Sequence, residues 1–289
     1  MVDQPKVDNR LQMQAPSYVL PIEDTDFLVN RDELRGLRFA VEYYKAELIL
    51  RDWGVHSTVI VFGSARIPSP EKSAADLAAA ESAEERARLE KAASWVKYYE
   101  EARSFGRLVS EEGGALKPAD GRRENVIATG GGPGIMEAAN RGALEAGAPS
   151  IGFNITLPGE QEPNAYSTPD LTFRFHYFAM RKMHLAMRAG ALAVFPGGFG
   201  TMDELFEILT LQQTRKVTAT PVVLVGREYW NRVINFEALT ESGLIDPADL
   251  GIFDIVDSGA EAWAALKARG LKPASGKRQR PRSDLSDDA

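Results

Sequence analysis

The sequence contains no cysteine, and this absence narrows the chemistry open to the protein. Without thiols there is no disulfide, no thiolate nucleophile and no metal site with sulfur ligands. Histidine is also scarce, with three in 289 residues. Any metal would therefore have to be bound by carboxylates and these few imidazoles.

Long apolar runs and an excess of basic charge are missing too. No stretch of about 18 apolar residues is present, which excludes a transmembrane helix, and the first residues do not resemble a secretory leader. We therefore expect a cytoplasmic protein with no membrane partner. The net charge of −7 leaves no basic surface over the body of the chain, so we expect no nucleic acid partner.

Short apolar runs rich in β-branched residues alternate with segments of helical periodicity through most of the chain. This spacing predicts a doubly wound, Rossmann-like α/β fold with helices on both faces of a parallel sheet of about seven strands. We place it in a single nucleotide-binding domain over residues 31–270. The expected strands cover residues 58–62, 126–129, 150–155, 171–178, 191–195, 221–225 and 252–256.

Three segments differ in composition from this pattern. Residues 1–30, rich in Pro, Asn and Gln, predict an irregular N-terminal arm. Residues 69–112 are dominated by Ala, Glu, Lys and Arg and predict a long helical segment of one or two helices. Residues 271–289 are basic and then acidic without apolar periodicity, which predicts a disordered tail.

Two glycine-rich loops follow expected strands, one at residues 130–134 and one at residues 197–200. In a doubly wound sheet, ligands bind beyond the carboxyl ends of the strands. Glycine lets backbone N–H groups approach a phosphate at a helix N-terminus, where the helix dipole favours negative charge. The pair of loops therefore predicts a phosphate or nucleotide site.

The spacing of the first loop disfavours two common kinds of nucleotide site. A dinucleotide fingerprint that starts at Gly130 would need a glycine where Ile135 stands, and an acid near the end of the next strand, which carries Asn154. Neither loop contains the Gly-Lys-Ser/Thr of a Walker motif. The sequence thus argues against NAD or FAD binding and against a nucleoside triphosphatase.

Glu204 has two possible roles. Thr201 and Glu204 have the spacing of a capping box, in which the carboxylate only accepts a backbone N–H. In the other interpretation, Thr201, Glu204 and Ile208 lie along one flank of the helix, from which the first two can reach a ligand. The buried face would then consist of Met202, Leu205, Phe206 and Leu209.

Arg181 and Lys182 stand near the start of the helix that follows the strand expected at 171–178. The helix dipole is unfavourable for cations at that position. The two cations therefore predict an anionic partner.

Together these motifs resemble the LONELY GUY (LOG) phosphoribohydrolases, a family also labelled lysine decarboxylase-like. The family signature PGGxGTxxE is complete from Pro196 to Glu204, and GGGPGIMEAAN from Gly130 to Asn140 is similar to its first glycine loop. Arg181-Lys182 matches its Arg-Lys pair. The resemblance covers roughly residues 57–257, and Phe199 and the long extensions are similar to the longer branch of the family.

The resemblance implies hydrolysis of the N-glycosidic bond of a purine nucleoside 5'-monophosphate, AMP or N6-substituted AMP, to free base and ribose 5-phosphate. It implies no metal and no cofactor, Glu204 and Arg181 as the catalytic pair, and a homo-oligomer, dimer or hexamer. The residues that it implies for substrate and phosphate binding are Gly63, Ser64, Gly130, Gly131, Gly132, Gly134, Met136, Lys182, Gly197, Gly198, Gly200 and Thr201.

Two alternatives use the same residues differently. The fold could serve a nucleotide-binding or carrier protein without turnover, because a fold does not fix a function. A decarboxylase dependent on pyridoxal phosphate would need a Schiff-base lysine beside a phosphate site. Lys182 is the only lysine near an expected loop.

Overall fold

The computed structural model describes residues 9–116, 121–156, 162–216 and 220–272. The chain divides into two units, residues 1–45 and 46–289, and the division falls within helix α3 (Arg35–Asp52), whereas we expected it after residue 30. Of the tail expected at 271–289, all but the first two residues lie outside the described part of the chain.

In the first unit, the arm that we expected to be irregular contains short helices in its described part. They are α1 (Asn9–Met13), η1 (Pro16–Tyr18), α2 (Thr25–Asn30) and η2 (Asp32–Leu34). Each has one or two turns, too few for apolar periodicity to be visible in the sequence. Local capping starts α2, where the Asp24 carboxylate accepts the backbone N–H of Phe27 at 2.9 Å. No residue from 10 to 45 is buried.

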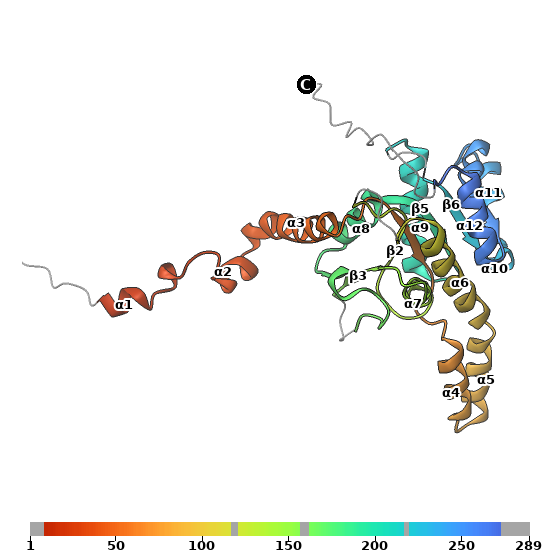
Figure 1. Cartoon of the computed structure of the whole chain (residues 1–289), viewed down its shortest axis with the longest axis horizontal. Helices are drawn as coiled ribbons and strands as arrows, with labels where there is room; N and C mark the ends of the chain where they lie inside the picture. Colours follow the sequence, from red (N-terminus) through yellow and green to blue (C-terminus); the bar gives the residue numbers. More distant parts are fainter. Residues whose placement is uncertain (1–8, 117–120, 157–161, 217–219, 273–289) are drawn as a thin grey trace, which may run out of the picture. The chain divides into compact units, whose positions relative to one another are not determined.

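In the second unit, the strands form one parallel sheet in the order β4-β3-β2-β1-β5-β6-β7. This confirms the predicted seven-stranded fold. Figure 1 labels β2, β3, β5 and β6 of this sheet. The order reverses at β1, so the carboxyl ends of β2, β1 and β5 adjoin at the position where such sheets bind ligands. The strands are β1 (Thr58–Phe62), β2 (Val126–Thr129), β3 (Ile151–Ile155), β4 (Thr172–Phe175), β5 (Ala189–Val194), β6 (Val222–Val225) and β7 (Phe253–Val256).

Helices cover both faces of this sheet, because alternate side chains of β1 lie in different cores. Val59 and Val61 share a core with residues of α6, α7 and α12. Ile60 and Phe62 share the other with residues of α3, α8 and α9. The elements after β1 are α4 (Pro70–Ala78), α5 (Ala83–Ala93), α6 (Val96–Glu112), α7 (Ile135–Glu145), η3 (Pro169–Leu171), α8 (Phe178–Met187), α9 (Phe199–Gln213), α10 (Arg227–Val233), α11 (Phe236–Glu241), η4 (Pro247–Ile252) and α12 (Gly259–Ala268).

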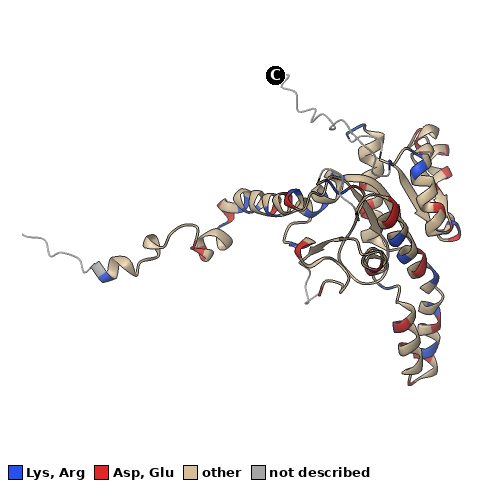
Figure 2. Cartoon of the chain, in the orientation of Figure 1, with Lys and Arg blue, Asp and Glu red and all other residues tan. Residues whose placement is uncertain are grey.

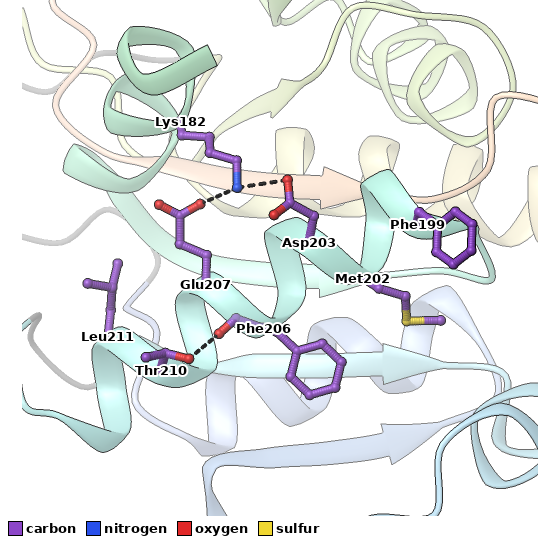
Figure 3. A pocket seen from close by; sticks show the side chains of 8 residues that line it. All are labelled: Lys182, Phe199, Met202, Asp203, Phe206, Glu207, Thr210 and Leu211. Carbon is purple, nitrogen blue, oxygen red and sulfur yellow. Dashed lines mark hydrogen bonds and ion pairs between the residues drawn. The ribbon is translucent and has the colours of Figure 1, made fainter.

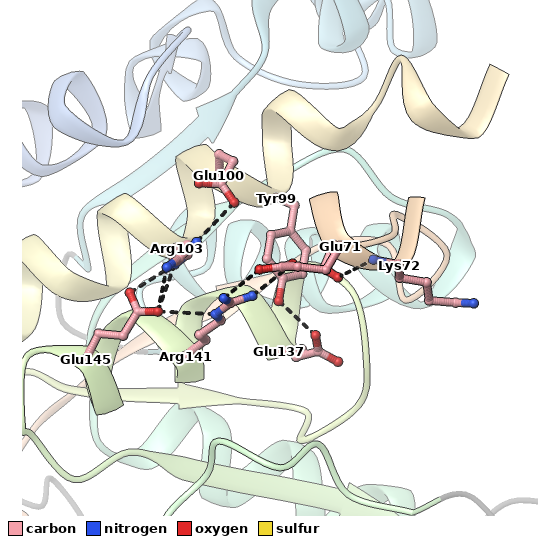
Figure 4. Close-up of polar contacts among 9 residues, drawn as sticks. Glu71, Lys72, Tyr99, Glu100, Arg103, Glu137, Arg141 and Glu145 are labelled. Atoms are coloured by element: carbon pink, nitrogen blue, oxygen red, sulfur yellow. Dashed lines mark hydrogen bonds and ion pairs between the residues drawn. The ribbon is translucent and has the colours of Figure 1, made fainter. Parts of the chain in front are cut away.

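The helical segment expected at 69–112 forms three helices, α4, α5 and α6, instead of one or two. Serine N-caps start both α4 and α5, at Ser69 and Ser82, which separates them from each other and from the loop before. Both signs of charge occur over these helices (Figure 2). An ion pair of 2.7 Å between Glu71 of α4 and Arg141 joins the segment to α7, and the hydrogen bond from Arg141 lowers the pKa of Glu71 to about 2 (Figure 4).

Within the described ranges, no helix combines the length and the apolar character that crossing a membrane requires.

The crossing of α6 and α7 depends on two glycines at which the helix backbones touch. A Cβ on Gly142 would lie 2.0 Å from the Arg103 carbonyl oxygen, and one on Gly106 would lie 2.3 Å from the Ala139 carbonyl oxygen. Real Cβ atoms do not approach backbone so closely, so a larger residue would force the helices apart.

We therefore expect Gly142→Ala to lower the free energy of unfolding by about 1–3 kcal/mol through overpacking. This is opposite to the stabilisation of roughly 1 kcal/mol that alanine gives inside an unhindered helix. Urea unfolding checks it, with Gly200→Ala in α9 as the control, because a Cβ at Gly200 would meet nothing within 4 Å. A Gly142→Ala protein at least as stable as the wild type would contradict the close crossing.

Candidate functional site

Three loops meet at the carboxyl edge of the sheet, after β1, β2 and β5. The backbone N–H of Ser64 donates to the Pro196 carbonyl oxygen at 2.9 Å, and the N–H of Ile135 donates to the Ser64 carbonyl oxygen at 3.2 Å. The loop that contains Gly63 and Ser64 therefore lies between the two glycine loops and is bonded to both. This edge brings together the loops that we expected to bind substrate.

The first glycine loop has positions that only glycine fits. Gly134 has a φ of +74°, and a Cβ there would lie 2.3 Å from the Ser64 carbonyl oxygen. Gly131 has a φ of +71°, and its Cβ would lie 2.3 Å from Nδ2 of Asn154. These glycines thus let the loop approach both the β1 loop and the end of β3.

Buried amides hold the first glycine loop in place. Asn164 donates from Nδ2 to the Gly132 carbonyl oxygen at 3.1 Å and to Oδ1 of Asn140 at 3.0 Å. The Thr129 hydroxyl also donates to Asn140 Oδ1, at 2.7 Å. Our sequence interpretation did not include Asn164. The signal available for it was its position directly after a proline in the loop that precedes β4.

The second glycine loop leads directly into α9, which begins at Phe199 with Gly198 as its N-cap. No side chain caps this helix. The backbone N–H groups of Gly198, Phe199 and Gly200 have no acceptor among the residues that the structure describes. The loop therefore presents free donors at the positive end of a helix dipole, as in known phosphate sites.

The capping-box interpretation of Glu204 is wrong. Because α9 begins at Phe199, Thr201 is already inside the first turn and is not the N-cap. The Glu204 side chain accepts from Arg181 and not from the backbone. The predicted buried face is also wrong at Phe206, which is 38% exposed. The side chains buried on α9 follow the i, i+3, i+4, i+7 pattern, namely Thr201, Glu204, Leu205 and Ile208.

Glu204 and Arg181 form a buried pair at this edge. Nη1 of Arg181 lies 3.4 Å from Oε1 of Glu204, and Nε of Arg181 donates to the Phe153 carbonyl oxygen at 2.8 Å. A Cβ on Gly130 would lie 2.6 Å from Nη2 of Arg181 and 2.9 Å from Sδ of Met136. The guanidinium therefore contacts the middle of β3, the first glycine loop and the α9 carboxylate at once.

Burial shifts the pKa values of both partners. It raises the pKa of Glu204 to about 7, although the positive charge of Arg181 opposes this shift. It also lowers the pKa of Arg181. A carboxyl group that titrates near neutral pH can act either as an anion or as a proton donor, which is typical of catalytic groups.

Lys182 is engaged differently from the other expected site residues. Its Nζ lies 2.8 Å from Oδ2 of Asp203 and 2.8 Å from Oε2 of Glu207, so it joins α8 to α9 (Figure 3). Burial lowers the pKa of Lys182, but the hydrogen bonds to the two carboxylates outweigh it and the pKa is raised. A Schiff base requires a neutral amine. Lys182 therefore does not fit the role of a pyridoxal phosphate lysine.

A cavity of about 560 Å³ lies on the outer side of α9, and neither Arg181 nor Glu204 lines it. Phe199, whose side chain is 94% exposed, and Phe206 are among the apolar residues that line it (Figure 3). The cavity is therefore a surface feature separate from the buried pair. Among the residues described, no group of three or more His, Asp or Glu side chains is placed to hold a metal ion.

The raised pKa of Glu204 predicts how stability depends on pH. In the folded protein this pKa is about 7 and its ordinary value is 4.5, so the native state binds more protons than the unfolded state between these values. Stability of the wild type should then fall as pH rises through this window, by up to about 3 kcal/mol from this group.

Glu204→Gln removes this titration. We expect the Tm of Glu204→Gln, relative to that of the wild type, to be higher at about pH 8 than at about pH 5. Thermal unfolding at both pH values measures the gain, and Glu111→Gln, an exposed glutamate on α6, is the control. An equal Tm difference at the two pH values would show that burial does not raise the pKa of Glu204.

Comparisons with known proteins agree with these motifs. The family model described as "Possible lysine decarboxylase" matches residues 136–266. The probable cytokinin riboside 5'-monophosphate phosphoribohydrolase LOG4 of Oryza sativa subsp. japonica is 28% identical over 149 residues, 50% of this chain and 63% of the relative. LOG5 of Arabidopsis thaliana is 26% identical over 155 residues, 51% of this chain and 64% of the relative. The chain thus spans less than two thirds of the length of these curated relatives.

Among solved structures, the molybdenum cofactor carrier protein MCP from Chlamydomonas reinhardtii is similar, with a TM-score of 0.44 and 22% identity over 75% of this chain and 99% of that one. The family match covers Arg181, the second glycine loop and Glu204, and it begins after the first glycine loop. Over residues 136–266 the chain is therefore similar to the family described as possible lysine decarboxylase, and about half of it is similar to the curated LOG proteins.

Proposed function

We propose that this protein hydrolyses the N-glycosidic bond of a purine nucleoside 5'-monophosphate, AMP or N6-substituted AMP, to free base and ribose 5-phosphate. The observation that carries the proposal is the buried Arg181–Glu204 pair, which lies beside two glycine loops at the carboxyl edge of the sheet. The substrate class follows from the curated relatives, whose names give cytokinin riboside 5'-monophosphates as the compounds that they hydrolyse.

In this proposal the second glycine loop binds the 5'-phosphate. The free N–H groups of Gly198, Phe199 and Gly200 supply donors, and the dipole of α9 favours the negative charge. The Thr201 hydroxyl lies against Gly197, where an added Cβ would be only 2.1 Å from Oγ1. Gly197 thus leaves room for this hydroxyl to join the loop as a further donor.

Glu204 acts on the sugar. Breaking the C1'–N9 bond leaves the bonding electrons on the base and builds positive charge on the ribose, as in glycoside hydrolysis. An ionised Glu204 stabilises that charge, water then adds at C1', and the proton that this water loses neutralises the departing base. Glu204 follows Thr201 by nearly one turn of α9, so a phosphate held at the helix start places the ribose near the carboxylate.

Arg181 orients the Glu204 carboxylate relative to the bound substrate. Its Nε is bonded to the Phe153 carbonyl oxygen, so its guanidinium has a fixed orientation. One side of it contacts Glu204, which leaves the remaining N–H groups free to contact the ribose or the departing base. Its positive charge also favours the ionised form of Glu204.

For this activity we expect Glu204→Gln to slow the release of base from AMP by at least about a hundredfold, because the transition state loses its opposing charge. The equilibrium dissociation constant for AMP should change only a few fold. Chromatography of free adenine and calorimetry of AMP binding measure the two effects.

The wild type itself should release base faster as pH rises through about 7, since the ionised fraction of Glu204 then increases. Turnover like that of the wild type in Glu204→Gln would refute the catalytic role. Tight AMP binding by the wild type without any adenine release would favour the nucleotide carrier instead. Parallel assays with GMP, CMP and N6-isopentenyl-AMP would define the preferred base.

We also propose that the protein forms a homo-oligomer, a dimer or a hexamer, through the outer face of α8 and α9. The face carries the exposed side chains of Phe199 and Phe206, and the exposed Phe178 lies one turn of α8 before Lys182, which lines the same cavity. Large apolar side chains clustered on a surface are typical of protein interfaces. The same cavity contains Lys182 beside Asp203 and Glu207, so the face offers both signs of charge to a second copy of itself.

Phe206→Asp should therefore lower the mass of the particle in solution, because it places a charge in the apolar contact. Light scattering after size exclusion gives the mass, and circular dichroism shows whether the fold is kept. Leu244→Asp, which changes an exposed leucine outside this face, is the matched control. A mass unchanged by Phe206→Asp would exclude this face as the interface.

A further inference from the structure

A tyrosine outside all the expected motifs contacts the second glycine loop. Tyr229, on α10, donates its hydroxyl to the Gly197 carbonyl oxygen at 2.5 Å. Its ring is half-buried, and burial raises its pKa, so the hydroxyl remains a donor at neutral pH. This bond links an element after β6 to the loop after β5.

The bond fixes the orientation of one peptide group. The Gly197 carbonyl and the Gly198 N–H belong to the same peptide unit, and no cis peptide bond occurs among the residues described. In a trans unit the C=O and the N–H point in opposite directions. The Gly198 N–H is therefore turned away from α10, and it is one of the donors without an acceptor in the described structure.

Without this restraint the peptide unit could rotate. It lies between two glycines, whose backbone dihedrals are the least restricted of all residues. The space near Gly198 is open, since a Cβ there would meet nothing within 4 Å. A single hydrogen bond from a fixed ring can therefore decide which way the Gly198 N–H points.

Aromatic rings hold Tyr229 in turn. Trp95, the residue before α6, packs edge-on against Tyr229 with ring centroids 5.8 Å apart, and its ring is also 5.8 Å from that of Tyr98. Tyr98 fills the space beside Gly226, where a Cβ would lie 2.7 Å from its ring. The start of α6 thus supports the side chain that contacts the glycine loop.

We propose that Tyr229 is a positioning residue for the phosphate site: it orients the Gly197–Gly198 peptide so that the Gly198 N–H donates to a phosphomonoester. The inference rests on the proposed function for the identity of the substrate. It deepens that function because α10 and the start of α6 then support the affinity for the phosphate, whereas Glu204 acts in the cleavage step.

The test compares Tyr229→Phe with Tyr98→Phe. Each loses one hydroxyl from the same aromatic group, but the Tyr98 hydroxyl makes no hydrogen bond within the described residues. For Tyr229→Phe we expect KM for AMP to rise about three- to tenfold, the loss typical of one hydrogen bond, with kcat within about twofold. The inhibition constants of inorganic phosphate and ribose 5-phosphate should rise by the same factor. Tyr98→Phe should change none of these.

Adenosine separates phosphate binding from general damage. Its dissociation constant, from calorimetry, should be the same in Tyr229→Phe as in the wild type, and thermal unfolding should show an intact fold. Equal weakening of adenosine and AMP, a loss of kcat at unchanged KM, or no change at all would overturn the proposal. If the wild type released no base, the proposed activity would fail, while the dissociation constants of AMP and inorganic phosphate would still test Tyr229.

Discussion

The contact between Arg181 and Glu204 is the constraint around which the site is built. Removing a carboxylate and a guanidinium from water is costly, and a 3.4 Å contact compensates only part of that cost. The raised pKa of Glu204 reflects the part that is not compensated. The neighbours accommodate the pair: the Phe153 carbonyl accepts from Arg181, and Gly130 leaves space for its guanidinium. The glycine at 130 is therefore needed for packing as well as for approach to a ligand.

The sequence predicted the sheet and the three loops because their signals are local. Each buried strand is a short run of β-branched or small apolar residues, and glycine clusters mark where two of the strands end. The parallel order then follows from the alternation with helices. The start of α9 could not be predicted in the same way. Thr201 and Glu204 have the spacing of a capping box. In the structure, however, α9 begins at Phe199, so Thr201 lies inside the helix and the N–H groups of the glycine loop have no side-chain cap.

Apart from the Arg181–Glu204 pair, which the resemblance implied, contacts between side chains distant in sequence were not predicted. The resemblance implied Lys182 as a substrate residue, and in the structure it forms ion pairs with Asp203 and Glu207. Their i, i+4 spacing on the next helix was the available sign that a cation would lie across them. Tyr229 carried no sign at all, because only the folded chain brings α10 to the glycine loop. Side chains that position a site depend on contacts between elements, whereas the loops depend on local geometry.

In the proposed reaction, the free-energy cost of ionising the buried Glu204 contributes to catalysis. In the free protein this charge is poorly solvated, and Arg181 opposes the shift without cancelling it. A neutral ribose stabilises the Glu204 carboxylate only slightly, whereas the positive charge that forms at C1' stabilises it strongly. The site is then more complementary to the transition state than to the bound substrate, which is the condition for a binding interaction to accelerate a reaction. In the same proposal, the affinity for the phosphate comes from the second glycine loop, which α10 and the start of α6 support. The binding energy gained there holds the ribose against Glu204, which stabilises the positive charge that forms at C1'.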